Sequence, residues 1–355
     1  MSPDPKTGLA KVFQVNRQGI NLTRGLWVVG ILLVPLVVLG LIDQEKYWLS
    51  IAFAILSVAL MDPGGVYQHR LRAMAGVGLI GVPLTALGFA VGGGPWGIVV
   101  LAAVVVTLLA GLAMKFGLHG MTAALLLNSW FLIAISVPAS EHLTPAHSGW
   151  WQQALAWAIG AALWIGLTSV VWLVRGRQAQ GSHLPEVPGD MSVTALTRSV
   201  ILFAVIRAVA IGIAVAIAFG LHLPNADWMP IATLVAMKAS LDQAALAAEQ
   251  RIVGALIGAL VATFLLLTVD NKHVLEVAIA ILGAFAATFR AANYAIYCAG
   301  VAAAVLIAED LPNPTNLGTE ARRVAFTFIG LGIGLVVLVL AGLIQKRSAR
   351  ATANG

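Results

Sequence analysis

The stretch that decides the fold is His222–Thr263, HLPNADWMPIATLVAMKASLDQAALAAEQRIVGALIGALVAT. A polar turn leads into an apolar run that begins at Trp228 and stops after roughly a dozen residues, about half of the length that crosses a bilayer. A mildly charged segment follows, and then a helix rich in small residues, with Gly254 and Gly258 four positions apart. A helix interrupted at membrane depth leaves backbone groups unpaired, which is tolerated only beside a water-filled cavity.

A weaker copy of this unit lies in the first half of the chain. Trp48 opens an apolar run that ends at Met61, the sequence Asp62-Pro-Gly-Gly breaks it, and Gly76 follows within the next apolar run. Short or interrupted hydrophobic segments at matching places in two halves are the best sequence indication of a transporter binding site. The alternative reading is an unbroken helix extended by a tilted amphipathic turn.

Composition identifies the class of protein. Hydrophobic residues make up 60% of the chain and charged residues only 10%, which excludes an ordinary soluble domain. Long apolar runs rather than short alternating segments predict an all-α membrane protein with about twelve transmembrane helices. The predicted segments are 25–42, 47–61, 73–92, 96–114, 120–138, 150–174, 200–221, 227–240, 251–269, 273–290, 292–308 and 323–344.

Positive charges predict the orientation. Twelve crossings place both termini on one side, and of the 21 Lys and Arg residues only Lys46, Lys272, Arg322 and Arg323 fall on the other side. Since cytoplasmic loops of membrane proteins are enriched in Lys and Arg, both termini are predicted to be cytoplasmic. The resulting divisions are a cytoplasmic segment 1–24, a first six-helix repeat 25–174, a cytoplasmic linker 175–199, a second six-helix repeat 200–344 and a cytoplasmic tail 345–355.

The two halves align with one another. Arg24 matches Arg207, Trp48 matches Trp228, and the offset between matched positions shrinks from about 183 to about 170 residues along the chain. Repeats with an even number of helices share one orientation, and transporters built this way bind substrate at the interface between the repeats. The other matched pairs are Arg72 with Arg251, Gly76 with Gly254, and Lys115 with Arg290.

Basic residues near the predicted cytoplasmic helix ends are the candidate substrate-binding groups. If several face inward, they form a positive vestibule that attracts organic anions and pairs with carboxylates. The alternative is that they are ordinary anchors that reach lipid headgroups. The candidates are Arg207, Arg251, Arg72, Lys238, Lys115 and Arg290.

Trp48 and Trp228 are candidates to flank the route, although tryptophan at a helix end is commonly an interfacial anchor. Asn128, in the middle of a predicted helix, either lines a cavity or makes an interhelical hydrogen bond.

Several kinds of site are not predicted. The single cysteine, Cys298, excludes a thiolate metal cluster, and no phosphate loop or nucleophile–base group is found. We therefore expect no enzyme activity, no catalytic residue, no cofactor and no metal. No acid or histidine was identified at mid-depth in a predicted helix, so no coupling ion is assigned.

The residues Arg207, Trp228 and Arg251-Ile-Val-Gly254-Ala-Leu-Ile-Gly258, in this order, resemble the fusaric-acid-resistance family of bacterial inner-membrane proteins. The resemblance is strongest over roughly 200–270. That family is associated with the efflux of aromatic carboxylic acids and is distantly similar to plant aluminium-activated malate transporters. Many members carry a sizeable soluble region, in place of which this chain has 25 residues between the halves, so recruitment of a periplasmic adaptor is not assigned.

The resemblance and the charge pattern together predict a bacterial inner-membrane exporter of small organic anions, with aromatic carboxylic acids as the expected substrates. The expected partners are the lipid bilayer and the anion, not nucleic acid, and homo-oligomers are left open. The alternatives are a passive organic-anion channel, a structural membrane subunit and a drug/proton antiporter of the major facilitator type. The last fits less well because the loop Asp62–Arg72 lacks the pattern of that class.

Overall fold

The structure is a computed structural model. It describes residues 12–140, 144, 147–177, 180–182, 196, 198–223, 228–237, 245–310, 325–326, 328–330 and 332–337, and the statements below concern these residues. The predicted all-α class is confirmed, because regular structure is helical apart from a short antiparallel pairing of β1 (Gly64–Gly65) with β2 (Gln180–Ser182). Six helical stretches are long and apolar enough to cross a membrane: Arg17–Leu41, Tyr67–Gly92, Gly120–Ala139, Trp150–Val174, Val200–Gly220 and Lys272–Phe289.

Every predicted hydrophobic segment contains helical residues, but several ends differ. The helix predicted at 73–92 begins earlier, at Tyr67, and the one predicted at 251–269 begins at Ala245. The helix predicted at 227–240 is described only over Trp228–Ala236. The number of crossings therefore stays a prediction, since α3 has only 14 residues and α9 only 9.

The chain forms two compact units, each of which contains segments from both predicted halves. Unit 1 comprises residues 1–89, 149–190 and 242–315, and unit 2 comprises residues 90–148, 191–241 and 316–355.

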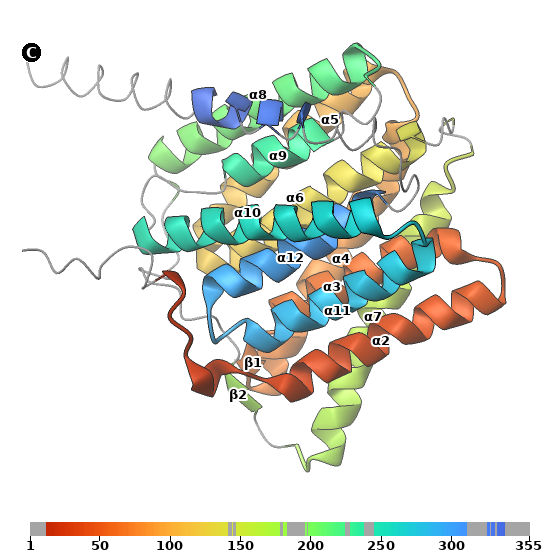
Figure 1. Ribbon diagram of the computed structural model, residues 1–355, viewed down its shortest axis with the longest axis vertical. Helices are drawn as coiled ribbons and strands as arrows, with labels where there is room; N and C mark the ends of the chain where they lie inside the picture. Colours follow the sequence, from red (N-terminus) through yellow and green to blue (C-terminus); the bar gives the residue numbers. More distant parts are fainter. Residues whose placement is uncertain are drawn as a thin grey trace, which may run out of the picture. The chain divides into compact units, whose positions relative to one another are not determined.

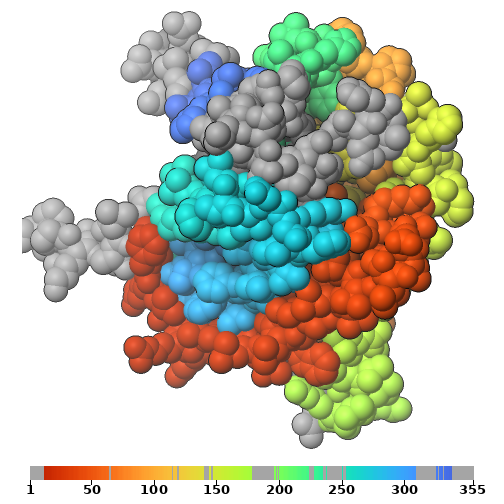
Figure 2. Space-filling view, turned by 45° about the vertical axis from the view of Figure 1, so that its right-hand side comes forward, coloured from red at the N-terminus to blue at the C-terminus, as the bar shows by residue number. Residues whose placement is uncertain are grey.

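Among the described residues, unit 1 contains seven α-helices. They are α2 (Leu22–Leu41), α3 (Trp48–Met61), α4 (Tyr67–Gly92, whose last residues belong to unit 2), α7 (Trp150–Val174), α10 (Ala245–Thr268), α11 (Lys272–Phe289) and α12 (Tyr294–Asp310). Helix α11 packs against α2 and α12, α10 packs against α12, and α3 packs against α7 (Figure 1). Figure 2 shows α10, α11 and α12 side by side with α2 on one face of this unit.

Capping residues set the ends of α2 and α11. The Asn21 side chain accepts a hydrogen bond from the Arg24 backbone N–H at 2.9 Å, and Asn271 does the same for the N–H of His273 at 2.9 Å. These bonds satisfy backbone donors that have no partner within the helix. Apolar side chains such as Leu26 of α2 and Leu260 of α10 are exposed, as expected for helices that face lipid.

Two glycines of α10 allow α10 and α12 to approach closely. A Cβ added at Gly254 would lie 2.7 Å from Cys298 Cβ, and one added at Gly258 would lie 2.7 Å from Ala302 Cβ. Both would also press on backbone carbonyl oxygens of α12. The Gly-x-x-x-Gly spacing is therefore a helix-packing motif.

Unit 2 contains α5 (Trp96–Leu112), η3 (Ala113–Phe116), α6 (Gly117–Ser140), α8 (Arg198–Gly220), α9 (Trp228–Ala236) and helical residues of 328–337. Helix α5 packs against α8 and α6. Asn128 of α6 donates to Thr107 Oγ1 of α5 at 3.2 Å, and both residues are fully buried. The interhelical hydrogen bond, rather than a cavity lining, accounts for Asn128.

The two units contain matching contacts. In unit 1, a Cβ added at Gly160 of α7 would lie 2.9 Å from Ala54 Cβ of α3 and would press on the carbonyl of Ile51. In unit 2, a Cβ added at Gly330 would lie 2.9 Å from Ala232 Cβ of α9 and would press on the carbonyl of Met229. The second and sixth segments of each predicted half thus meet through similar contacts, in which a glycine lies against a carbonyl oxygen and an alanine Cβ.

Candidate anion-binding site

The candidate site lies where α3 ends, within unit 1. Helix α3 stops at Met61, and Asp62 adopts an extended conformation with φ −67° and ψ 109°. Pro63 follows and has no backbone N–H to continue a helix. The last carbonyl groups of α3 therefore need partners from elsewhere in the protein.

Two arginines from other helices supply these partners. Arg24, near the start of α2, donates from Nη2 to the Ala59 carbonyl oxygen and, at 3.4 Å, to that of Asp62. Arg290, which directly follows α11, donates from Nη1 to the Asp62 carbonyl oxygen at 2.9 Å. Both guanidinium groups thereby act on the end of α3, where the helix dipole is negative.

The Asp62 side chain binds a third arginine. Arg70, in the first turn of α4, donates from Nε to Oδ1 at 2.9 Å and from Nη2 to Oδ2 at 2.8 Å. This bidentate arrangement is the strongest form of Arg–carboxylate pairing. Arg70 and Asp62 are each only 2% exposed.

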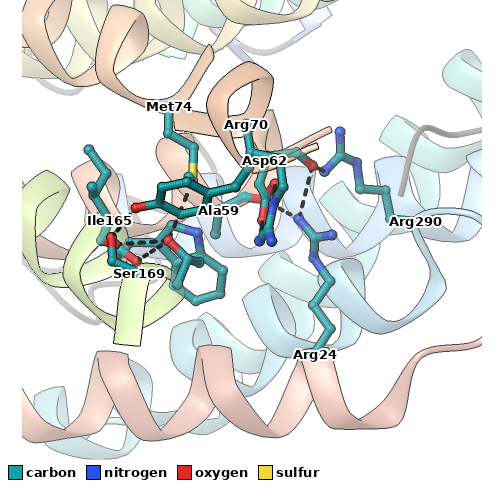
Figure 3. Close-up of polar contacts among 11 residues, drawn as sticks. Arg24, Ala59, Asp62, Arg70, Met74, Ile165, Ser169 and Arg290 are labelled. Carbon is teal, nitrogen blue, oxygen red and sulfur yellow. Dashed lines mark hydrogen bonds and ion pairs between the residues drawn. The ribbon is translucent and has the colours of Figure 1, made fainter. Parts of the chain in front are cut away.

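We call Arg24, Asp62, Arg70 and Arg290 the arginine cluster. Figure 3 shows the guanidinium groups converging on Asp62 from three different helices or helix ends. Three guanidinium groups face one carboxylate, so the cluster carries a formal charge of +2. The end of α3 contributes about half a negative charge, which leaves most of this excess uncompensated.

The cluster also has buried donors without acceptors. Arg24 Nε, Arg24 Nη1 and Arg70 Nη1 are buried and make no hydrogen bond within the part of the chain that the structure describes. Guanidinium groups stay protonated in proteins, and a buried donor without a partner costs about 1–3 kcal/mol. An anion with several acceptor oxygens, such as a carboxylate, would satisfy both the charge and the donors.

Aromatic and hydroxyl side chains surround the start of α4. The Tyr67 ring stacks on Trp172 with centroids 4.1 Å apart, and the Tyr67 hydroxyl lies 2.6 Å from Ser169 Oγ. Thr168 Oγ1 lies 3.9 Å from Sδ of Met74, which is labelled in Figure 3. Tyr67 precedes Arg70 by one helical turn, so an aromatic surface adjoins the charged groups along α4.

Of the substrate-binding residues predicted from the sequence, Arg290 lies in the arginine cluster. Arg72, on the same helix as Arg70, is exposed. Arg207 of α8 is 1% exposed, and Lys115 lies 4.7 Å from the centre of the Phe116 ring; both belong to unit 2. Lys238 and the side chain of Arg251 lie outside the described residues.

The two predicted tryptophans are buried inside the protein rather than exposed at its surface. Trp48 is 1% exposed and donates from Nε1 to the Leu32 carbonyl oxygen at 3.4 Å. Trp228 is 2% exposed. Both rings therefore pack inside the protein. Among the described hydrogen bonds, none joins either ring to the arginine cluster.

Sequence reasoning missed three members of the cluster. Arg24 was matched with Arg207 in the alignment of the halves but was not selected, and Arg72 was selected in place of Arg70. The useful signal was the position of Asp62, an acid directly before a proline at the end of an apolar run. A charged residue there is held next to unpaired carbonyl groups, which attract arginines.

A second charged group lies at the other end of α11. Glu45, His273 and Glu276 have oxygen or nitrogen atoms within 4.8 Å of one another. The Lys272 ammonium lies 3.2 Å from Glu45 Oε2 and 3.9 Å from Glu276 Oε1, so a positive charge already sits between the two carboxylates. We therefore interpret this group as an ion-pair network and assign no metal to it.

Comparisons with known proteins give one match. No curated protein and no solved structure is significantly similar to the chain. Residues 192–337, which contain Arg207, Trp228 and the Arg-x-x-Gly-x-x-x-Gly motif, match the family described as fusaric acid resistance protein-like. The resemblance inferred from the sequence is thereby confirmed over residues 192–337 of this multi-pass membrane chain, which are similar to the fusaric acid resistance protein-like family.

Proposed function

We propose that the protein is a transporter, not an enzyme, that exports small organic anions, principally aromatic carboxylic acids, across the bacterial inner membrane. The observation that carries this proposal is the arginine cluster, with its formal charge of +2 and its three buried nitrogen atoms without acceptors. The match of residues 192–337 to a family named for fusaric acid resistance supports the direction of transport and the class of substrate.

In this proposal the carboxylate of the substrate accepts hydrogen bonds from Arg24 and Arg70. These arginines are held in place by their bonds to Asp62 and to the end of α3, so little reorganisation is needed on binding. Tyr67, one turn before Arg70 on α4, and its stacking partner Trp172 favour substrates with a planar ring. Arg290 donates to the carbonyl oxygen of Asp62, to which Arg24 also donates.

We also propose that the chain consists of two parallel six-helix repeats with cytoplasmic termini. The similar contacts of Gly160 with α3 and of Gly330 with α9 support the repeat. The packing of α11 on α2 supports it too, because its counterpart under the repeat is the packing of α5 on α8. Arg207 is the counterpart of Arg24, and we assign it, with Lys115 as the counterpart of Arg290, to a second anion-binding position.

Binding to purified protein tests the proposal most directly. Benzoate should raise the thermal unfolding temperature of the detergent-solubilised protein, whereas benzamide, which has a similar shape but no charge, should not. Arg70→Gln should abolish the effect of benzoate, because it removes one charge and an unpaired donor. Arg17→Gln is the control for the loss of one positive charge, since Arg17 is exposed and precedes α2, the helix that carries Arg24.

Export is then measured in cells. Cells that express the wild-type protein should tolerate fusaric acid and related aromatic acids better than cells that express the Arg70→Gln variant at the same level. Equal tolerance, together with an equal benzoate shift in the two purified proteins, would contradict the proposal. Single-channel currents in planar bilayers would identify a passive channel instead of a carrier.

A further inference from the structure

The ion-pair network at the start of α11 contains a buried acid that the proposed anion site does not use. The Glu276 side chain is 1% exposed, although it lies only one turn into α11. Its Oε2 atom is 3.1 Å from His273 Nδ1, and its Oε1 atom is 3.9 Å from Lys272 Nζ. We call Glu45, Lys272, His273 and Glu276 the Glu276 network.

His273 connects this acid with water. Its side chain is 64% exposed, one ring nitrogen faces Glu276, and the other, Nε2, lies 3.9 Å from Glu45 Oε1. An imidazole in this position can accept a proton from water at Nε2 and pass the Nδ1 proton to Glu276 Oε2. After this step the imidazole is neutral with its proton on Nε2, and the Glu276 carboxylate has become a carboxylic acid. One proton has thus moved from water to the buried side chain.

The charged groups that face Glu276 are few. On its own helix they are Lys272 and His273, and from η2 (Glu45–Tyr47) it is Glu45. Helix α3 carries no charged residue, and the one charged residue of α2, Arg24, lies at the far end of that helix. Helix α12 ends in Glu309 and Asp310, whose side chains lie outside the described residues.

Helix α11 joins the two polar sites. Glu276 and Arg290 lie on one continuous element about 20 Å apart, at 1.5 Å per residue. The helix is held to the α2 region at both ends. At one end Lys272 pairs with Glu45, and at the other Gly25 of α2 packs directly against Thr288. Glu276 near the start of α11 and Arg290 at its end are therefore connected through one helix, so protonation of Glu276 changes the charge on the helix that positions Arg290.

We infer that Glu276, reached through His273, is the proton-binding site that couples proton influx to anion export. This inference rests on the proposed function for its transport role, but not for proton binding itself. Under the predicted orientation the Glu276 network faces the periplasm, where protons are supplied. Export of a monovalent anion in exchange for one proton moves two charges in the favourable direction, each worth about 2.3 kcal/mol per 100 mV.

The transport test separates coupling from substrate movement. Proteoliposomes are assayed with labelled benzoate in two modes: transport driven by an imposed pH gradient, and exchange of benzoate at equal pH and equal concentration on both sides. Glu276→Gln should reduce gradient-driven transport by about tenfold or more and leave exchange within about twofold, because exchange needs no net proton transfer. His273→Gln should slow gradient-driven transport while leaving exchange intact.

Asp43→Asn is the matched control. Asp43 is an exposed acid near Glu45 with φ 54°, a conformation that asparagine adopts readily, so both transport modes should be unchanged. Gradient-driven transport by Glu276→Gln at the wild-type rate would overturn the inference. Equal loss of both modes in this variant would also overturn it, because Glu276 would then serve structure or substrate binding.

Proton binding is measured separately, without substrate. Infrared difference spectra recorded across a pH titration should contain a carboxylic-acid carbonyl band that is lost in Glu276→Gln and retained in Asp43→Asn. Identical spectra of wild type and Glu276→Gln would overturn the inference. If the wild-type protein moves no organic anion at all, the proposed function fails, and the infrared titration alone still decides whether Glu276 binds a proton.

Discussion

At the residue scale, the arginine cluster combines hydrogen bonds that stabilise the protein with buried donors that we propose bind the substrate. Arg24 and Arg290 complete the hydrogen bonding of α3, whereas Arg70 is oriented by Asp62. Capping a helix end requires only one or two donors, and three arginines supply many more. The donors left over, on Arg24 and Arg70, are the ones available to a ligand.

Replacing Asp62 with asparagine should destabilise the protein strongly. The substitution leaves the buried Arg70 guanidinium without its counter-charge, which typically costs about 3–5 kcal/mol. The measurement is unfolding of the purified variant in detergent, by heat or by denaturant. The double variant Asp62→Asn/Arg70→Gln should recover part of the loss, because it restores the formal charge of the cluster to +2.

Arg17→Gln serves again as the control for a change of one charge at an exposed position. If Asp62→Asn unfolds at the same temperature as this control, the Asp62–Arg70 pair contributes nothing to the stability of the protein, and Asp62 does not hold Arg70 in place.

At the element scale, the matched glycines of the two halves differ in their surroundings. The glycines of the Arg-x-x-Gly-x-x-x-Gly motif allow α10 to approach α12, where added methyl groups would meet backbone carbonyl oxygens. In the first half the matched residue, Gly76, has nothing within 4 Å of an added Cβ. The equivalence found in the sequence is therefore not an equivalence of packing at this position.

This difference predicts opposite outcomes for two identical substitutions. Gly254→Ala should lower the stability of the protein by about 1–3 kcal/mol, because the new Cβ would lie 2.7 Å from Cys298 Cβ in a rigid helix pair. Gly76→Ala should be neutral or slightly stabilising, since alanine is the better helix former. Thermal unfolding of the two purified variants, side by side, measures the difference, and equal destabilisation would contradict the described packing.

Much of the element scale could be predicted from sequence, because apolar runs and prolines are local signals. The break after Met61 was predicted from Asp62-Pro-Gly-Gly, and α7 was predicted with the bounds 150–174 that the structure has. The partners of each helix could not be predicted in this way. Nothing local to Arg24 indicates that its guanidinium reaches α3, 35 residues further along the chain.

At the scale of the whole molecule, the two compact units differ from the two predicted halves. Helices α2, α3, α4 and α7 of the first half share unit 1 with α10, α11 and α12 of the second half. A duplicated chain can exchange helices between its copies without changing the sequence pattern, because equivalent helices present equivalent faces. Sequence alignment of the halves therefore predicts the repeat but not which copies pack together.

The proposed repeat predicts matched effects at Gly160 and Gly330. Each substitution by alanine would press a methyl group against a backbone carbonyl, that of Ile51 or that of Met229, so each should destabilise by about 1–3 kcal/mol. Because the two sites lie in different units, their effects on the free energy of unfolding should add. Gly166→Ala, on α7 with open space around it, is the control.

The number of crossings is the last prediction, and the distribution of charge argues for it. If twelve segments cross, both termini face the cytoplasm, and Lys46, Lys272, Arg322 and Arg323 are the only basic residues outside it. In a Cys298→Ala background, single cysteines placed at Arg17 and Arg177 should react with an impermeant thiol reagent only after the cells are permeabilised. A cysteine at Asp43 should react in intact spheroplasts. Labelling of residues 17 and 43 from the same side would show that α2 does not cross, and the periplasmic access assigned to His273 would then fail as well.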